Sequence, residues 1–347
     1  MPKLPAARGP ASEWLLAVLS GSACARAGGA PVPAVADVLA DDDVQLALYV
    51  CYELHYRGLP GVDDRWEWDV TLLTARAAWE ELFEVALLGA LGAPDGARVA
   101  AEDMDVALRA VVDADDSPSL SQHLDRDGTL EEVLEFVVHR SAYQLKEADP
   151  HSWAIPRLSG PPKAALVEVQ ADEYGGGRPE RVHAELFAES MDALGLDRTY
   201  GAYVDTLPGV TLATVNLMSL LGLHRRWRGA IDGHLATFEM TSSLPNRRYG
   251  NALRRLGFGK RATDFFDEHV AADAVHENVA AVDLAGGLVR QEPALAPDVL
   301  WGARALLELE GRWARHLLSS WAAGRSSLLS APVNPGCGSD PFKFNSA

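Results

Sequence analysis

The chain has 347 residues, of which 48% are hydrophobic, and its 49 acidic and 31 basic side chains give a formal net charge of -18 at pH 7. This excess of negative charge repels nucleic acids and anionic membrane surfaces, so we expect neither as a partner. No apolar stretch reaches the length of a membrane span. The three cysteines, Cys24, Cys51 and Cys337, are far apart and lack C-x-x-C spacing, which excludes a disulfide framework or zinc knuckle and indicates a reducing, cytoplasmic compartment.

Residues 1–35 are rich in alanine, glycine and proline, which is typical of a loose arm. Within them "LLAVLSGSACARA" resembles a signal peptide, because it follows basic residues and ends in small ones. Glu13 stands at the head of the apolar run, and the run is only one or two helical turns long. We therefore predict one short buried helix here.

The remaining pattern is helical, and alternating β-branched runs are scarce. Thr129 and Glu132 have the spacing of a capping box at the start of one helix, and Asp149-Pro150 is predicted to end that helix. Pro179 is predicted to open another helix at its first turn. The stretches "RWEWD" and "ADDSPSLS" are expected to be loops. In chain order, the predicted helices are 41–57, 71–92, 102–113, 129–146, 163–174, one from 179, 198–222, 226–242, 246–256, 261–282 and 296–321.

His269, Asp273 and His276 are spaced i, i+4 and i+7, so a helix places them on one stripe. Two imidazoles and a carboxylate on an apolar-flanked stripe are costly to bury unless something satisfies them, and a metal ion does so. The alternative is an exposed polar stripe.

Glu173 and His183 lie on either side of three glycines and a proline. On an uninterrupted helix their Cα atoms would be separated by about 15 Å along the axis, too far to share one metal site. A glycine-rich break removes that obstacle, because glycine permits the dihedral angles of a sharp turn. The alternative is an ordinary corner between two helices.

Glu147 follows a predicted helix, where its side chain is free either to point inward or to pair at the surface with Lys146 or Arg140. Taken together, these three regions offer three carboxylates and three imidazoles. Oxygen and nitrogen ligands suit iron or manganese, and six ligands suit two ions better than one. The Glu-x-x-His repeats of ferritin-like bundles do not occur at these positions. The candidate ligands are Glu147, Glu173, His183, His269, Asp273 and His276.

The sequence resembles the haem-oxygenase-like diiron oxidases and oxygenases, also called iron-containing redox enzymes. The resemblance rests on "LKEADPHSWAIPRLSG", "VEVQADEYGGGRPERVHAELF" and "FFDEHVAADAVHENVA", in that order, and covers roughly residues 129–325. It implies that all six candidate residues are iron ligands. It also implies an all-α, haem-oxygenase-like helical bundle that holds no haem.

The resemblance implies a layout of three parts. Residues 1–125 would form an arm and helical extension packed on the core, 126–325 the diiron domain, and 326–347 an extended tail. It further implies two iron ions per chain, with manganese as an alternative at one position, and dioxygen as co-substrate. A small-molecule substrate, an external electron donor such as a ferredoxin, and a homodimer are expected as partners.

Family members oxygenate amine nitrogens, desaturate or fragment amino acids, or cleave fatty-acid chains. For this chain we expect N-oxygenation of an amine or amino-acid-like metabolite rather than desaturation or carbon–carbon cleavage. Glu239 either receives an ammonium group of the substrate or is a carboxylate on the helix surface or behind the metal ligands. Two alternatives stay open: a metal-free protein of the same fold that binds a small molecule, and a mononuclear or manganese–iron oxidase. His151 is expected to lie behind the metal ligands. The other histidines are expected to be structural or exposed: His55, His123, His139, His224, His234 and His316.

Overall fold

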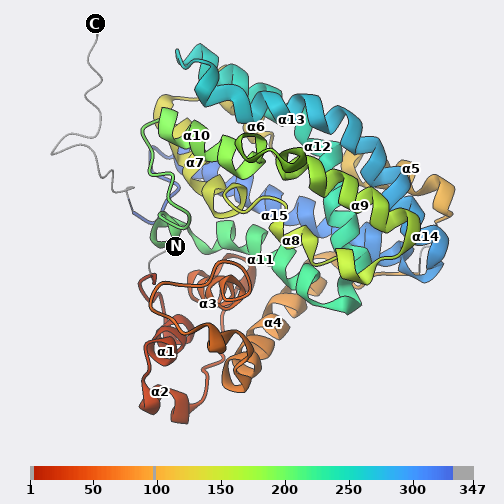
Figure 1. Ribbon diagram of the computed structural model, residues 1–347. Helices are drawn as coiled ribbons and strands as arrows, with labels where there is room; N and C mark the ends of the chain where they lie inside the picture. Colours follow the sequence, from red (N-terminus) through yellow and green to blue (C-terminus); the bar gives the residue numbers. More distant parts are fainter. Residues whose placement is uncertain (1–3, 97–98, 331–347) are drawn as a thin grey trace, which may run out of the picture.

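The computed structural model describes residues 4–96 and 99–330, without the side chains of residues 273–275. All regular structure in this part of the chain is helical, and no strand occurs in it. The predicted all-α class is therefore confirmed (Figure 1). None of the helices in the described ranges is both long and apolar enough to cross a membrane. The extended tail predicted for 326–347 lies outside the described residues from 331 onward.

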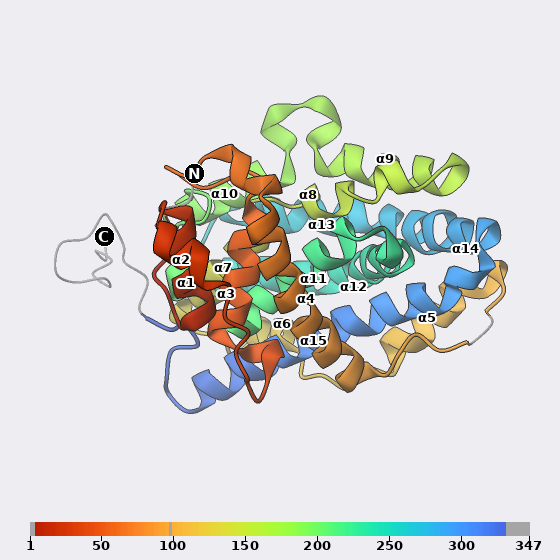
Figure 2. The same ribbon diagram turned by 90° about the horizontal axis from the view of Figure 1, so that it is seen from below.

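Four helices precede the main bundle and lie together on one side of it (Figures 1 and 2). The helix α3 packs against α1 and α4, and its other side meets the buried helix α11 of the bundle. Asp41 begins α3 by accepting hydrogen bonds from the backbone N–H groups of Asp43 and Val44, as an N-cap does. The helices are α1 (Pro10–Leu19), α2 (Ala23–Gly28), α3 (Asp42–Glu53), α4 (Val70–Leu91) and α11 (Gly209–Leu223).

Three long helices form the centre of the bundle: α12 (Arg228–Arg255), α13 (Lys260–Asn278) and α15 (Ala296–Ala322). The helix α12 packs along both of the others. At its crossing with α15 the backbones touch, because a Cβ at Gly233 would collide with Val299 and one at Gly302 would collide with Ala230. The close crossing fixes the position of α12, which carries the residues that face α13.

Shorter helices enclose this centre: α5 (Met104–Asp113), α6 (Leu120–Arg126), α7 (Leu130–Gln144), α8 (Asp149–Ser152), α9 (Gly160–Glu173), α10 (His183–Ala193) and α14 (Gly287–Gln291). The capping box of Thr129 and Glu132 is present at the start of α7, as predicted. After α13 the chain continues as a π-helical segment, Val279–Gly286, which packs against α9. π-Helical turns are rare and concentrate near functional sites.

The structure corrects several of the predicted helices. The helix predicted to open at Pro179 begins at His183, after a short 3-10 turn at Pro179–Arg181. Helix α12 continues through Pro245, where the sequence predicted a break. Residues 198–208 hold only the short 3-10 turn Val204–Thr206, and the helix predicted there begins at Gly209. Asp149-Pro150 begins α8 rather than ending α7, because a proline is tolerated in a helix's first turn. Helix α6 was missed, since only seven residues separate the preceding loop from the next one.

Candidate metal centre

Glu147 lies in the turn that joins α7 to α8, and its carboxylate is buried. The next residue, Ala148, has a φ of 71°, a left-handed conformation that no other non-glycine residue in the described ranges adopts. The Gln170 amide donates a hydrogen bond of 2.9 Å to the Ala148 carbonyl and so secures this turn from α9. Left-handed alanine costs about 1–2 kcal/mol, which the surrounding contacts must offset.

The break between Glu173 and His183 forms a tight corner. Helix α9 ends at Glu173, the glycines at 175–177 all have positive φ, and α10 begins at His183. The corner brings His183 Nδ1 to 2.9 Å from Glu173 Oε2, and both side chains are buried. The structure therefore places the two residues side by side.

Helix α13 contributes two buried imidazoles. His269 Nδ1 lies 2.8 Å from the carbonyl oxygen of Phe265. A carbonyl oxygen can only accept, so Nδ1 carries a proton, and the other ring nitrogen, Nε2, lies 3.4 Å from Glu147 Oε1. His276 Nε2 lies 3.0 Å from Asp172 Oδ2, and His276 Nδ1 lies 3.5 Å from Glu239 Oε2.

Asp273, the sixth predicted ligand, lies on α13 between these two histidines. Its side chain is outside the described residues, so its predicted role stays a prediction.

The described ligand atoms form two adjacent groups, and within each group all atoms lie within 4.8 Å of one another. The first group contains Glu147, Glu173, His183 and His269, and the second contains Glu173, Glu239 and His276. Glu173 belongs to both groups. Glu239, on α12, was not predicted as a ligand, because nothing in its spacing connects it to the other motifs. It was expected to receive the ammonium group of a substrate.

Several of these atoms are buried without a hydrogen-bond partner: Glu147 Oε2, Glu173 Oε2, His183 Nδ1 and His276 Nδ1. Although His183 Nδ1 and Glu173 Oε2 are 2.9 Å apart, their directions are not those of a hydrogen bond. Each buried unsatisfied polar atom costs about 1–3 kcal/mol. Iron bound between such nitrogen and oxygen atoms would satisfy all of them, so the residues present fit a metal site.

The carboxylates and imidazoles of the cluster shift one another's pKa values. Burial raises the pKa of the Glu147 carboxyl, and nearby His269 only partly offsets this. Burial lowers the pKa of His276, but Glu239, Asp172 and Glu173 outweigh it and raise that pKa to about 9. Three buried carboxylates, Glu147, Glu173 and Glu239, thus converge on this interior, and their negative charge would favour binding of a cation.

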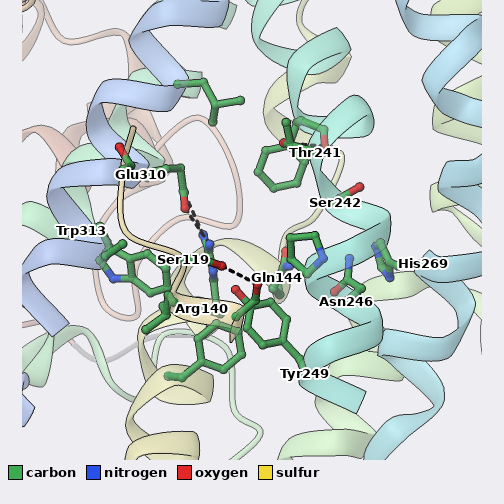
Figure 3. Close-up of a pocket in the computed structure, with 18 of the residues that line it drawn as sticks. Ser119, Arg140, Gln144, Thr241, Ser242, Asn246, Tyr249, His269, Glu310 and Trp313 are labelled. Carbon is green, nitrogen blue, oxygen red and sulfur yellow. Dashed lines mark hydrogen bonds and ion pairs between the residues drawn. The ribbon is translucent and has the colours of Figure 1, made fainter. Parts of the chain in front are cut away.

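A cavity of about 290 Å³ adjoins the first group, and Glu147 and His269 form part of its wall. Its other lining residues come from α6 and the loop before it and from α7, α10, α12, α13 and α15, and Figure 3 shows His269, Asn246 and Ser242 on one side of it. A second cavity of about 10 Å³ lies among Glu147, Glu173 and Glu239. His151 also lines this small cavity and contacts His234 at 3.1 Å.

Comparison with known families supports the same interpretation. The model of the family described as "Iron-containing redox enzyme" matches residues 134–311, just over half of the chain. The chain belongs to this family of iron-containing redox enzymes. Its domain has the haem-oxygenase-like fold, and the N-terminal helices precede the matched region.

Among curated proteins, the chain is similar to the nitrosourea synthase of Streptomyces achromogenes subsp. streptozoticus. The two are 27% identical over 175 residues, which is 48% of this chain and 36% of the relative. This chain therefore matches about a third of the length of that relative.

Proposed function

We propose that this protein is a non-haem diiron oxygenase that binds two iron ions side by side in the buried cluster. The observation that carries the proposal is that two groups of converging ligand atoms share Glu173 and leave buried atoms unsatisfied. A shared carboxylate is the group that would bridge two ions, and membership of an iron-containing family supports iron as the metal.

Under this proposal each ion has its own ligands. Glu147, His183 and His269 would hold the first ion, and Glu239, His276 and Asp273 the second, with Glu173 between them. The ions, when bound, supply the reduction of dioxygen. The carbonyl of Phe265 holds a proton of His269 on Nδ1, so Nε2 is the ring nitrogen that would bind a metal ion.

For the reaction we propose N-oxygenation of an amine or amino-acid-like substrate. One oxygen atom of O2 enters an N–H bond to give a hydroxylamine, and the other leaves as water. Two electrons and two protons complete the balance, and an external donor such as a ferredoxin would supply the electrons. The relative's name supports this choice, because a nitrosourea contains an oxidised nitrogen.

The chain's own residues provide the setting for this reaction. The cavity beside Glu147 and His269 would place the substrate nitrogen next to the metal centre, and its aromatic wall would exclude water. The aromatic residues of that wall are Phe136, Phe187, Phe238, Tyr249, Phe265, Phe266 and Trp313.

Measuring the metal content tests whether the buried cluster binds two iron ions. The protein is loaded with ferrous iron without oxygen, desalted and analysed for iron, and about two ions per chain are expected. Glu173→Ala should lose most of both ions, because it removes the shared ligand. Glu168→Ala, an exposed carboxylate on the same helix, should retain them. Wild-type protein that retains no iron would contradict the proposal and favour a metal-free binding protein.

The reaction is tested by mixing the anaerobic ferrous protein with oxygen in the presence of amines, amino acids or fatty acids. Mass spectrometry with isotopically labelled dioxygen should show one oxygen atom added to a nitrogen-containing substrate. A product that has instead lost two hydrogens, or a shortened carbon chain, would contradict N-oxygenation while leaving the diiron centre in place.

A further inference from the structure

Two buried histidines lie beside the candidate ligands without belonging to either ligand group. His151 on α8 and His234 on α12 are each 1% exposed, and His151 Nε2 lies 3.1 Å from His234 Nδ1. The other ring nitrogen of His151, Nδ1, is buried without a hydrogen-bond partner. A buried nitrogen that makes no hydrogen bond lowers the stability of the fold, so its presence beside the candidate centre calls for an explanation.

Close backbone contacts hold the two histidines in place. A Cβ at Gly222 of α11 would lie 2.7 Å from the carbonyl oxygen of Pro150, so α8 rests directly on α11. His234 follows Gly233, the residue at which α12 touches α15. The His234 ring also stacks on the Phe238 ring, with 12° between the two planes. The position of the pair is therefore set by the packing of four helices.

The small cavity of about 10 Å³ has His151 and Gln170 in its wall, together with three carboxylates of the candidate centre. Gln170 Nε2 donates hydrogen bonds to the Ala148 carbonyl (2.9 Å) and to Ser152 Oγ (2.7 Å), which uses both amide hydrogens. Gln170 Oε1 can only accept, and it is also buried without a partner. Beside the ligands, the wall thus contains one unpaired imidazole nitrogen and one unpaired amide oxygen.

The size of this cavity limits what it can hold. A water molecule needs about 10–15 Å³ on this measure, so the space suits about one or two non-hydrogen atoms. Glu147 and His269 line both this cavity and the larger one, so the two spaces meet at the ligand cluster. An organic substrate fits only the larger cavity, which leaves the smaller one for dioxygen and for the water formed from it.

Two arrangements of protons satisfy the hydrogen bond between the histidines. Burial lowers the pKa of His151 to about 4 and that of His234 well below its usual value, so both rings are neutral at pH 7. Either His151 Nε2 donates to His234 and Nδ1 faces the cavity as a lone pair, or His234 Nδ1 donates and His151 carries its proton on Nδ1. The negative charge of nearby Glu173 favours the second arrangement, because it attracts an N–H and repels a lone pair.

We infer that His151, oriented by His234, donates its Nδ1–H to the dioxygen-derived atom that occupies the small cavity, and that Gln170 Oε1 accepts a hydrogen bond from the water that is formed. This inference rests on the proposed function. A fixed N–H stabilises the negative charge that oxygen gains as it is reduced, and the proton stays on the ring. Dioxygen and the organic substrate then meet the centre from separate cavities.

Nitric oxide, a diatomic molecule that binds ferrous iron as dioxygen does, tests the hydrogen bond without turnover. The wild-type protein is loaded with ferrous iron, fully exchanged into H2O or D2O and exposed to nitric oxide in the absence of oxygen. Infrared spectroscopy then measures the N–O stretching band. The band should differ between the two solvents, because a deuteron replaces the hydrogen-bonding proton of His151.

A matched pair of variants assigns this shift to His151. The amide nitrogen of His151→Asn takes the place of Nδ1, whereas that of His151→Gln takes the place of Nε2. His151→Asn should therefore keep the solvent shift, and His151→Gln should lose it, with the iron content of both unchanged. Oxidation of the ferrous protein by oxygen should slow on the order of a hundredfold in His151→Gln, and less in His151→Asn. His139→Asn, at a buried histidine that lines neither cavity, is the control.

Three results would overturn the inference: an N–O band that is the same in both solvents, a solvent shift that persists in His151→Gln, or an iron-loaded His151→Asn that behaves as His151→Gln does. If the variants fail to fold or lose iron, the solvent shift of the wild type still decides. Wild-type protein that retains no iron would contradict the proposed function, and this inference with it. Wild-type protein that retains iron but shows no solvent shift contradicts this inference alone.

Discussion

Three consecutive glycines determine where Glu173 lies relative to His183. All three have positive φ, but only at Gly175 would a Cβ meet the backbone, at 2.7 Å from the carbonyl carbon of Arg181 and 2.8 Å from the nitrogen of Val182. Around Gly176 there is open space. The close approach at Gly175 folds the corner back on itself, and this is what lets α10 start beside the end of α9.

The two glycines therefore provide a matched pair of variants. Gly176→Ala should cost about 1–2 kcal/mol of unfolding free energy, the cost of a left-handed alanine. Gly175→Ala should cost about 1–3 kcal/mol more, because it also overpacks the corner, and it should lower the iron content by moving Glu173 away from His183. Urea unfolding and iron analysis measure both effects, and equal losses in the two variants would show that the close approach does not matter.

At the scale of single elements, α12 shows how packing overrides local preference. A proline in a helix interior costs about 3 kcal/mol relative to alanine, yet α12 runs unbroken through Pro245. The helix is held along its length by α13 and α15, so the proline does not end it. Pro245 also lines the larger cavity, next to Asn246.

Replacing this proline should stabilise the protein and disturb the cavity. We expect Pro245→Ala to raise the free energy of unfolding by about 1–3 kcal/mol, since it restores a backbone hydrogen bond and removes a steric clash. Binding of cavity ligands should weaken at the same time. Leu244→Ala, at the exposed neighbouring position, serves as the control and should change neither property much. A destabilised Pro245→Ala variant would show that the bundle depends on the proline.

At the scale of the whole molecule, a buried ion pair joins the N-terminal helices to the turn that carries Glu147, a residue of the candidate metal centre. Lys146 directly precedes Glu147, and its ammonium lies 3.2 Å from Glu53 at the end of α3. Both side chains are at most 1% exposed. Tyr200 donates its hydroxyl to Glu53, and the Tyr56 ring lies 4.3 Å from the ammonium. The turn that presents Glu147 is thus attached to a helix outside the region that matches the family.

Breaking this pair should affect both stability and metal binding. Lys146→Met should lower the free energy of unfolding by about 3–5 kcal/mol, because it leaves the buried Glu53 carboxyl without its cationic partner. It should also reduce the iron content, although Lys146 is not a candidate ligand. Adding Glu53→Gln should recover much of the loss. Lys260→Met, at an exposed ion pair, is the control, and a Lys146→Met variant as stable as this one would contradict the anchoring role.

Part of the candidate site could be predicted from the sequence, because some of its features depend on residues that are close together in the chain. The spacing of His269 and His276 follows from the helical period. The glycines between Glu173 and His183 indicated a corner, since few other residues adopt the required dihedral angles. Thr129 and Glu132 indicated the start of a helix, because they have the spacing of a capping box. These features depend on backbone geometry within a few residues, so they can be predicted without knowing the fold.

Only the tertiary structure decided the contacts between distant segments. Sequence spacing gave no reason to place Glu239 with His276, because the two residues lie on separate helices, α12 and α13, and only the packing of these helices brings them together. The continuation of α12 through Pro245 was likewise unpredictable, since the neighbouring helices, and not the local preference, hold it. The sequence by itself determined which ligand types this protein offers; packing determined which of them meet and what cavity lies beside them.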